Sequence, residues 1–217
     1  MIITIDGPAG SGKSTVARLL ADRLQVRFLD TGAMYRAVAL AVLQADVDET
    51  DAAAVAAVAD STRLEIPESG LVLNGTDVSE TIRTPEVTAV SSVVAANPDV
   101  RRRLVEMQRE IGTQGSLVTE GRDQGTVVFP KAEHKFFLTA SVDARARRRH
   151  RELLANGSTL SLATVRTQLR QRDERDENRS HAPMKPADDA QIIDTSSLSI
   201  ADVVDTLADI VTNSPQQ

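Results

Sequence analysis

A glycine-rich loop near the start of the chain constrains its fold more than any other feature of the sequence. Residues 7–14 read Gly-Pro-Ala-Gly-Ser-Gly-Lys-Ser and match the pattern G-x-x-x-x-G-K-[ST] at every fixed position. The match follows a short apolar run, Ile2–Asp6, and precedes a helical pattern, Lys13–Leu24, which is the strand–loop–helix context that the motif requires. The glycines let backbone N–H groups turn inward around phosphate oxygens, and the helix N-terminus adds partial positive charge. The sequence therefore predicts a loop that binds the phosphates of ATP or GTP.

Two side chains of this loop have predicted roles of their own. Lys13 reaches the β and γ phosphates, and the hydroxyl of Ser14 ligates Mg²⁺, which we expect as the cofactor that accompanies ATP. The motif identifies ATP or GTP as the bound nucleotide, but it does not identify the molecule that would accept a phosphoryl group from it. The residues expected to contact ATP are Gly7, Pro8, Ala9, Gly10, Ser11, Gly12, Lys13, Ser14 and Thr15.

Composition excludes several other classes of protein. The chain has 217 residues, 26% of them charged and 41% hydrophobic, which suits one well-buried core. It has no cysteine, so disulfides, thiolate zinc sites and a cysteine nucleophile are all ruled out. The first residues lack a basic segment and a long apolar run, so we expect a cytoplasmic protein with no membrane span.

Charge points to a small anionic ligand. The net charge is −6, yet ten arginines fall between residues 145 and 179. A binder of nucleic acid needs a broad basic surface, which an acidic chain with one local arginine-rich segment does not supply. We therefore expect small-molecule substrates and no nucleic-acid partner. The sequence has no large repeated apolar surface that would indicate an interface with a second copy of the chain, so we expect a monomer.

The spacing of apolar runs predicts an α/β fold. Five such runs alternate with helical patterns, which predicts a five-stranded parallel sheet of the P-loop NTPase type, with helices on both faces and ligands beyond the carboxyl ends of the strands. Two stretches interrupt this rhythm. Residues 62–79 contain Asn-Gly between short apolar runs and predict a small antiparallel insert. Residues 156–186 are polar, arginine-rich and bounded by Gly and Pro, which predicts a mobile helical lid. The predicted strands are Ile2–Asp6, Arg27–Asp30, 116–120, 135–138 and Gln191–Asp194.

Absent motifs narrow the class of enzyme. The sequence lacks the Asn-Lys-x-Asp motif that reads guanine in GTPase switches, and it lacks an apolar strand that ends in Asp-Glu as in motor ATPases. The chain is also too short for most motors, which leaves a small P-loop kinase. An Arg122-Asp123 pair flanked by glycines follows the third predicted strand, where a ligand contact is expected.

Several further motifs give the chain a resemblance to bacterial cytidylate kinases, from Ile2 to about Leu207. Besides residues 7–15, they are Asp-Thr-Gly-Ala-Met-Tyr-Arg at 30–36, Ile-Arg-Thr-Pro-Glu-Val at 82–87, Gly-Arg-Asp-Gln-Gly-Thr-Val-Val-Phe-Pro at 121–130 and Arg-Asp-Glu-Arg-Asp-Glu-Asn-Arg at 172–179. One departure is Gln124, where the family usually carries an apolar residue, and we expect it to affect the packing of that loop without loss of activity.

The resemblance implies an enzyme that transfers the γ-phosphoryl group of ATP to CMP, and also to dCMP. It implies a single unit, residues 1–217, with a core (1–30, 114–155 and 187–217), a monophosphate-binding part that contains the insert (31–113) and the lid (156–186). By position, the family's CMP-contacting residues match Thr31, Arg36, Ser92, Arg101, Arg122, Asp123, Arg172, Asp176 and Arg179.

Elementary chemistry agrees with this assignment. A carboxylate such as Asp123 can accept from the N4 amino group of cytosine, and Arg101 with Ser92 can donate to N3 and O2. Transfer to a phosphate dianion needs positioning and neutralisation of charge more than a general base. The expected catalytic residues are Lys13, Arg122, Arg172, Arg175 and Arg179.

Spacing alone leaves the role of the lid open. Arg172, Arg175, Asp176 and Arg179 fall on one face of a helix, either as a clamp for phosphates or as a salt-bridged solvent face, and the resemblance favours the clamp. The alternatives for the whole chain are a small-metabolite P-loop kinase of the shikimate or gluconate type and a non-catalytic ATP-binding switch.

Overall fold

The computed structural model describes residues 1–67, 70–155 and 157–213. Contacts divide the chain into two compact units, and we describe each by itself: unit 1 is Met1–Leu29 with Ser116–Gln217, and unit 2 is Asp30–Gly115. The division into core, monophosphate-binding part and lid stays a prediction. Its limits at residues 156 and 217 lie outside the described residues.

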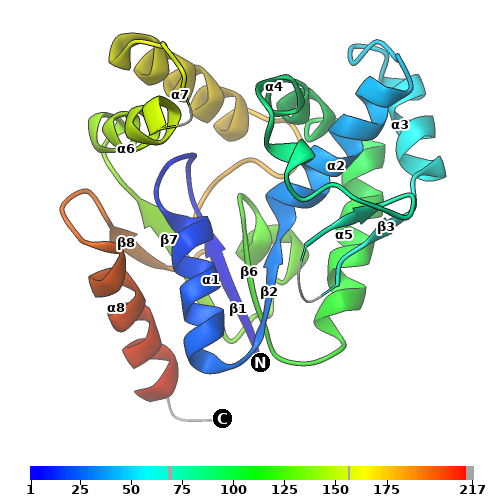
Figure 1. Cartoon of the computed structure of the whole chain (residues 1–217). Helices are drawn as coiled ribbons and strands as arrows, with labels where there is room; N and C mark the ends of the chain where they lie inside the picture. The colour runs from blue at the N-terminus through cyan, green and yellow to red at the C-terminus, as the bar shows by residue number, and fades with distance from the viewer. Residues whose placement is uncertain (68–69, 156, 214–217) are drawn as a thin grey trace. The chain divides into compact units, whose positions relative to one another are not determined.

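Unit 1 contains the predicted five-stranded parallel sheet, which confirms the fold class (Figure 1). The strand order is β2-β6-β1-β7-β8, so β1 is central, with β6 on one side and β7 on the other. Two strands differ slightly from prediction, because β6 runs one residue later and β7 extends beyond both predicted ends. The strands are β1 (Ile2–Asp6), β2 (Arg27–Asp30), β6 (Leu117–Gly121), β7 (His134–Thr139) and β8 (Gln191–Asp194).

Alternation along β1 gives the sheet two different faces. Ile3 and Ile5 are fully buried in the main apolar core, with residues of helices α1 (Lys13–Leu24) and α8 (Ile200–Asn213). Thr4 and Asp6 point to the opposite face, because successive side chains of a strand alternate. There they meet η2 (Gln124–Val128), a single π-helical turn that follows β6. The polar face of β1 therefore lies under the loop that carries Arg122 and Asp123.

Two further helices of unit 1 pack against each other, α6 (Val142–Ala155) and α7 (Leu162–Glu177). Helix α7 begins at Leu162, because Ser161 caps it by accepting from the backbone N–H of Thr164. Between the two helices lies a second, smaller core that contains Ala9 of the phosphate loop together with Ala146, Val165 and Leu169.

Unit 2 contains four α-helices and the predicted antiparallel insert among its described residues. Asn74 and Gly75 both have positive φ, which is the turn geometry that Asn-Gly favours in a two-residue hairpin. The predicted insert, residues 62–79, includes residues 68 and 69, which lie outside the described residues. The elements are α2 (Thr31–Gln44), α3 (Ala52–Ser61), β3 (Leu64–Glu65), β4 (Val72–Leu73), β5 (Thr76–Asp77), η1 (Thr81–Arg83), α4 (Pro85–Val94) and α5 (Pro98–Gly112).

Local sequence explains where the helices of unit 2 begin. Asp30, Asp51, Thr84 and Asn97 each accept a hydrogen bond from the first turn of the following helix. Proline occupies the first position of α4 and α5, where its missing N–H costs nothing. In α2, Asp30 is the cap and Thr31 is the first helical residue.

Within the described parts of the chain, no helix has the length and apolar character needed to cross a membrane.

Candidate active site

The glycine-rich loop connects β1 to α1 as the sequence predicts. A Cβ on Gly7 would lie 2.1 Å from the backbone oxygen of Leu138 on β7, so any side chain at this position would displace the neighbouring strand. Gly12 caps α1 with φ 92°, a left-handed conformation that glycine adopts without strain. These two glycines hold the loop in a form that other residues could not adopt at the same low cost.

Lys13 is buried at the base of this loop, with 5% of its surface exposed. Its Nζ donates to the backbone oxygen of Pro8 at 3.0 Å and lies 3.9 Å from Oε2 of Glu120 on β6. Burial, together with the nearby charge of Arg122, lowers the pKa of Lys13 to about 7, against the attraction of Glu120. A bound phosphate would add negative charge beside this ammonium group and so favour its charged form.

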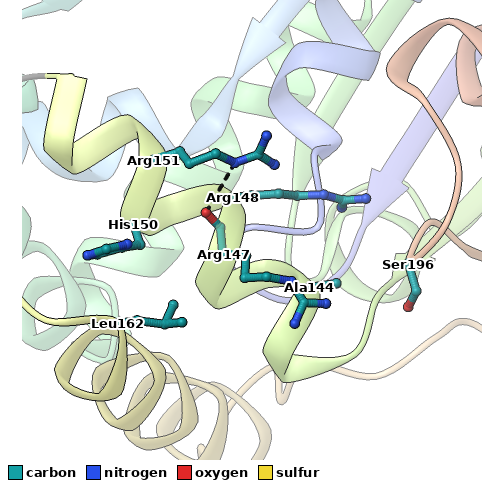
Figure 2. A pocket seen from close by; sticks show the side chains of 7 residues that line it. All are labelled: Ala144, Arg147, Arg148, His150, Arg151, Leu162 and Ser196. Atoms are coloured by element: carbon teal, nitrogen blue, oxygen red, sulfur yellow. Dashed lines mark hydrogen bonds between the residues drawn. The ribbon is translucent and has the colours of Figure 1, made fainter.

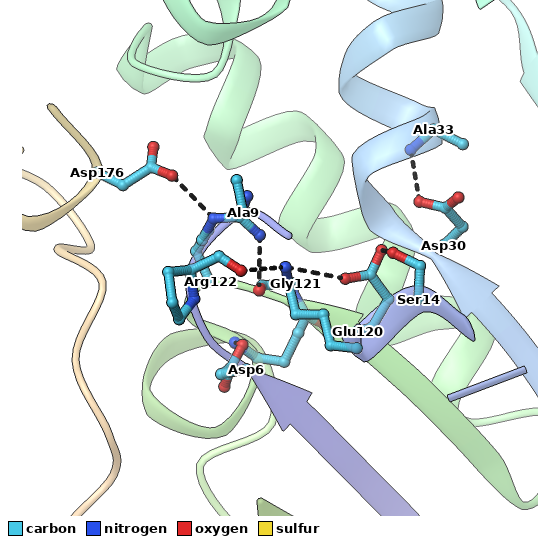
Figure 3. Close-up of polar contacts among 12 residues, drawn as sticks. Asp6, Ala9, Ser14, Asp30, Ala33, Glu120, Gly121, Arg122 and Asp176 are labelled. Atoms are coloured by element: carbon cyan, nitrogen blue, oxygen red, sulfur yellow. Dashed lines mark hydrogen bonds and ion pairs between the residues drawn. The ribbon is translucent and has the colours of Figure 1, made fainter. Parts of the chain in front are cut away.

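Glu120 also contacts the predicted magnesium ligand. The hydroxyl of Ser14 donates to Oε1 of Glu120 at 2.9 Å (Figure 3). A hydroxyl and a carboxylate oxygen side by side are the hard-oxygen groups that Mg²⁺ prefers. The described residues contain no cluster of three or more His, Cys, Asp and Glu side chains suited to a metal ion. The pair therefore fits an ion that is held mainly by phosphates and water, as is usual for Mg²⁺.

Arg122, one residue beyond the end of β6, forms a half-buried ion pair with Asp176 on α7. Its Nε lies 2.8 Å from Oδ2 of Asp176, and its Nη1 donates to the backbone oxygen of Gly121 (Figure 3). Burial opposes the charged form of Arg122, but the carboxylates of Asp176 and Glu120 outweigh it and raise the pKa of the guanidinium. Burial likewise works against the Asp176 carboxylate, and the neighbouring arginines, led by Arg122, hold its pKa below the usual value. Both groups are therefore charged at neutral pH.

Asp6 on β1 holds the loop that carries Asp123. The carboxylate of Asp6 accepts from the backbone N–H groups of Gln124 at 2.9 Å and Gly125 at 2.8 Å. Burial raises the pKa of Asp6 to about 7 even though these two hydrogen bonds lower it. Asp123 is itself buried, with 4% of its surface exposed. The carboxylate predicted to read cytosine thus belongs to a tightly held turn.

Gln124, the departure from the family pattern, is accommodated by a second polar residue. Its Oε1 accepts from the hydroxyl of Thr119 on β6 at 3.0 Å, and both side chains are buried. A buried amide with a partner avoids most of the cost of desolvation. The packing of this loop is therefore supported by a hydrogen bond at the position where the family usually carries an apolar residue.

The predicted stripe of four charged residues on α7 is partly wrong. The helix ends at Glu177 with Asn178 as its C-cap, so Arg179 lies beyond the helix. Its Nε donates to the backbone oxygen of Asp176 at 3.3 Å. Arg175 is exposed and donates to Gln171 of its own helix, whereas Arg172, Asp176 and Arg179 are half-buried. The spacing of these four residues predicted one continuous helix, but the helix ends at its C-cap, Asn178.

Four predicted CMP contacts lie in unit 2. Thr31 and Arg36 belong to α2, and Nη2 of Arg36 lies 3.4 Å from Oδ2 of Asp30. Arg101 on α5 is buried, with its guanidinium 5.7 Å from the ring centre of Tyr35. Ser92 lies in α4 and donates to the backbone oxygen of Ala89 at 3.4 Å. Their role in binding stays a prediction.

A cavity of about 390 Å³ opens along α6, and its lining is rich in arginine (Figure 2). Arg148 donates to the side-chain and backbone oxygens of Thr195, in the loop that follows β8. The hydroxyl of Thr195 donates in turn to the backbone oxygen of Ser11 at 3.0 Å, so the cavity wall is joined to the phosphate loop. The lining residues are Ala144, Arg147, Arg148, His150, Arg151, Leu162 and Ser196.

Comparisons with known proteins agree on one family. The profile described as cytidylate kinase matches residues 3–213. A cytidylate kinase of Carboxydothermus hydrogenoformans is 47% identical over 215 residues, which cover 97% of each chain. Another, of Mycobacterium leprae, is 48% identical and covers 97% of this chain and 95% of the relative. The chain belongs to the cytidylate kinase family.

Membership of this family makes the chain an ATP-dependent kinase, that is, a phosphotransferase. A solved shikimate kinase of Bacteroides thetaiotaomicron has a TM-score of 0.51 at 12% identity, covering 98% of each chain, which is a likeness of fold alone. The resemblance seen in the sequence is thereby confirmed at the level of the family.

Sequence reasoning missed several groups of this site. Glu120 was overlooked because only an Asp-Glu pair was sought at a strand end, whereas a single acid at the end of an apolar run would have indicated it. Asp6 ends the apolar run Ile2–Asp6 in the same way, whereas Arg145 and the cavity along α6 give no such local signal. They depend on which segments lie side by side in the folded chain.

Proposed function

We propose that this kinase transfers the γ-phosphoryl group of Mg-ATP to CMP and to dCMP, and releases ADP with CDP or dCDP. One observation carries the proposal: the half-buried Arg122 and the buried Asp123 follow the strand next to β1, held in place by Asp176 and by Asp6. An anion-binding guanidinium beside a carboxylate suits an acceptor that has a phosphate and a base with an exposed amino group.

In this proposal Asp123 reads the acceptor base. Its carboxylate accepts from N4 of cytosine, and Arg101 with Ser92 donates to N3 and O2. Uracil presents a carbonyl oxygen in place of the amino group, so Asp123 would face it with no proton between them. Thr31, Arg36, Arg122, Arg172, Asp176 and Arg179 complete the acceptor contacts, with the arginines on its phosphate and Asp176 near the ribose.

We expect Asp123→Ala to lower the preference for CMP over UMP by roughly 10- to 100-fold, the range for losing one base-reading contact. Values of kcat/KM for CMP and UMP, measured side by side, give this ratio. Gln124→Leu is the matched control, because it alters the same turn and restores the apolar residue usual in the family. A ratio in Asp123→Ala equal to that of the parent would refute the assignment.

On the donor side, the backbone of residues 7–15 and Lys13 bind the triphosphate. Ser14, with Glu120 beside it, would hold Mg²⁺, which when bound offsets the charge of the β and γ phosphates. The nucleoside part of ATP then occupies the cavity along α6, since that cavity adjoins the phosphate loop through Thr195. A planar guanidinium such as that of Arg148 can stack on a purine.

Arg148→Ala is expected to raise KM for ATP roughly tenfold, because it removes a stacking surface worth about 1–2 kcal/mol. KM for CMP should change by no more than about twofold, since a surface change away from the acceptor has little effect. Arg149→Ala is the control, because Arg149 lies on the same helix but pairs with Glu152 and does not line the cavity. Equal effects of the two substitutions on KM for ATP would refute the donor pocket.

The chemistry of the step rests on position and charge. The phosphate of CMP has a second pKa near ~6, so at neutral pH it is largely a dianion and already nucleophilic. Lys13, Arg122, Arg172, Arg175 and Arg179 neutralise the charge that spreads over the transferred group. In the proposed lid, residues 156–186, closure excludes water, which limits wasteful hydrolysis of ATP. No side chain has to remove a proton from the acceptor.

The direct test is a panel of acceptors. Purified protein with Mg-ATP is given CMP, dCMP, UMP, AMP, shikimate or gluconate, and ADP is followed. We expect turnover with CMP and dCMP well above that with the others. Turnover only with shikimate or gluconate would identify a small-metabolite kinase, and nucleotide binding without turnover on any acceptor would identify a switch. We propose that the enzyme acts in the cytoplasm as a monomer.

A further inference from the structure

A buried arginine outside the predicted site joins the phosphate loop to helix α7. Arg145 on α6 has 4% of its surface exposed. Its Nε donates to the backbone oxygen of Ala140 at 2.9 Å, which fixes the guanidinium against the start of its own helix. Its Nη1 donates to the backbone oxygen of Ala9 at 3.1 Å and also lies 2.7 Å from Oδ2 of Asp173. One nitrogen thus contacts both the phosphate loop and α7.

Apolar packing also joins the phosphate loop to helices α6 and α7. Ala9 lies in the small core formed with Ala146 of α6 and with Val165 and Leu169 of α7. A Cβ on Gly10 would lie 3.3 Å from Cβ of Arg145, so α6 approaches the loop closely at the next residue as well. A shift of the loop at Ala9 would therefore displace groups of both helices, because close-packed side chains transmit displacement.

On α7, the residue that pairs with Arg145 lies close to the predicted phosphate-binding residues. Asp173 follows Arg172 directly and lies three residues before Asp176, which pairs with Arg122. Two carboxylates on α7, the buried Asp173 and the half-buried Asp176, therefore contact two arginines outside that helix, Arg145 and Arg122. Together they set both the rotation of α7 and its position along its axis.

Stability alone does not account for the pair of Arg145 with Asp173. Removing two charges from water is costly, and replacing a buried ion pair by apolar residues of similar size is often neutral or stabilising. The second oxygen of Asp173, Oδ1, is buried and has no hydrogen-bond partner among the described residues, which adds to the cost. A buried pair in this setting fixes geometry more than it adds stability.

We propose that Arg145 and Asp173 are positioning residues that couple the phosphate loop to α7, so that binding of a nucleotide at the loop orders the helix that carries Arg172 and Asp176. This inference rests on the proposed function for the role of those two residues in phosphoryl transfer. Neither Arg145 nor Asp173 touches a substrate in this scheme, and each acts through the backbone that it holds.

The first experiment compares Asp173→Asn with a matched control. Asp143→Asn breaks the exposed pair of Asp143 with Arg166, which joins the same two helices at 3.5 Å. Amide hydrogen exchange is measured by mass spectrometry over residues 162–177, with and without ADP. We expect ADP to slow exchange in the parent and in Asp143→Asn, and to have little effect in Asp173→Asn. A parental response to ADP in Asp173→Asn would overturn the proposal.

Kinetics separate positioning from a structural role. We expect Asp173→Asn to lower kcat at saturating ATP and CMP by roughly 10- to 100-fold, with KM for ATP changed by no more than about threefold, because misplaced positioning groups act on turnover. Asp143→Asn should match the parent, since exposed ion pairs contribute little. A lowered melting temperature with parental kcat in Asp173→Asn would assign the pair to stability alone.

A second variant covers the case in which Asp173→Asn fails to fold. The double substitution Arg145→Met with Asp173→Leu replaces the pair by apolar side chains and leaves no uncompensated charge, so it should fold. We expect it to lose both the response of α7 to ADP and most of kcat. A double variant with parental kcat and a parental response would overturn the proposal.

The exchange measurement also separates this inference from the proposed function, because it uses ADP and needs no acceptor. If ADP orders α7 in the parent but CMP is not phosphorylated, the proposed function fails and the coupling stands. If CMP is phosphorylated but ADP leaves exchange in α7 unchanged, the coupling fails alone.

Discussion

Lys13→Met is expected to lower kcat for CMP phosphorylation by about 10³-fold, because it removes a preorganised cation at the position where negative charge develops. Methionine keeps the apolar stem of lysine and omits the ammonium group, so the buried position remains filled. The burial of Lys13 strengthens this expectation, since a charge shielded from water acts more strongly on a neighbouring phosphate. Steady-state kinetics at saturating ATP and CMP measure the effect.

The chain supplies a matched control for this substitution in its other buried lysine. Lys135 on β7 also has an ammonium group held by a backbone oxygen and a carboxylate, those of Pro130 and Asp189. Lys135→Met should lower the melting temperature and leave kcat close to that of the parent, because it breaks a comparable pair away from the phosphate loop. If both substitutions reduced kcat alike, the loss would reflect general damage to the fold.

The sequence predicted those features that depend on neighbouring residues along the chain. The phosphate loop, the strand before it and the helix after it were predictable because turn and period signals are local. The antiparallel insert followed from Asn74-Gly75 for the same reason. The end of α7 was missed, because charged residues on both sides of Asn178 are equally compatible with a longer helix.

The contacts that shape the candidate site join residues far apart in the sequence. Ser14 meets Glu120, Arg122 meets Asp176, and Arg145 meets Ala9. Each contact depends on which strands are neighbours and on how α6 and α7 lie against the phosphate loop. A periodic pattern fixes which face of an element is buried, but it does not say which residue lies opposite. The family resemblance supplied candidate residues without their partners, and the structure supplies those partners within each unit.

The second large effect is expected at Arg179. Because Arg179 lies just beyond the end of α7, its position depends on the short segment that follows Asn178 and on its bond to the backbone of Asp176. A guanidinium on a segment that closes over the phosphates can neutralise charge that appears only as the phosphoryl group moves. Such a contact raises turnover without strengthening the binding of ATP.

Arg179→Ala should therefore lower kcat by about 10³-fold, the lower end of the range for a single cationic finger, while KM for ATP changes by no more than about threefold. Arg170→Ala is the control, since Arg170 is an exposed arginine of α7 and has no proposed role. A turnover number equal to that of the parent would remove Arg179 from the mechanism. A rise in KM for ATP with unchanged kcat would instead make Arg179 a donor-binding residue, because uniform binding affects KM and spares the chemical step.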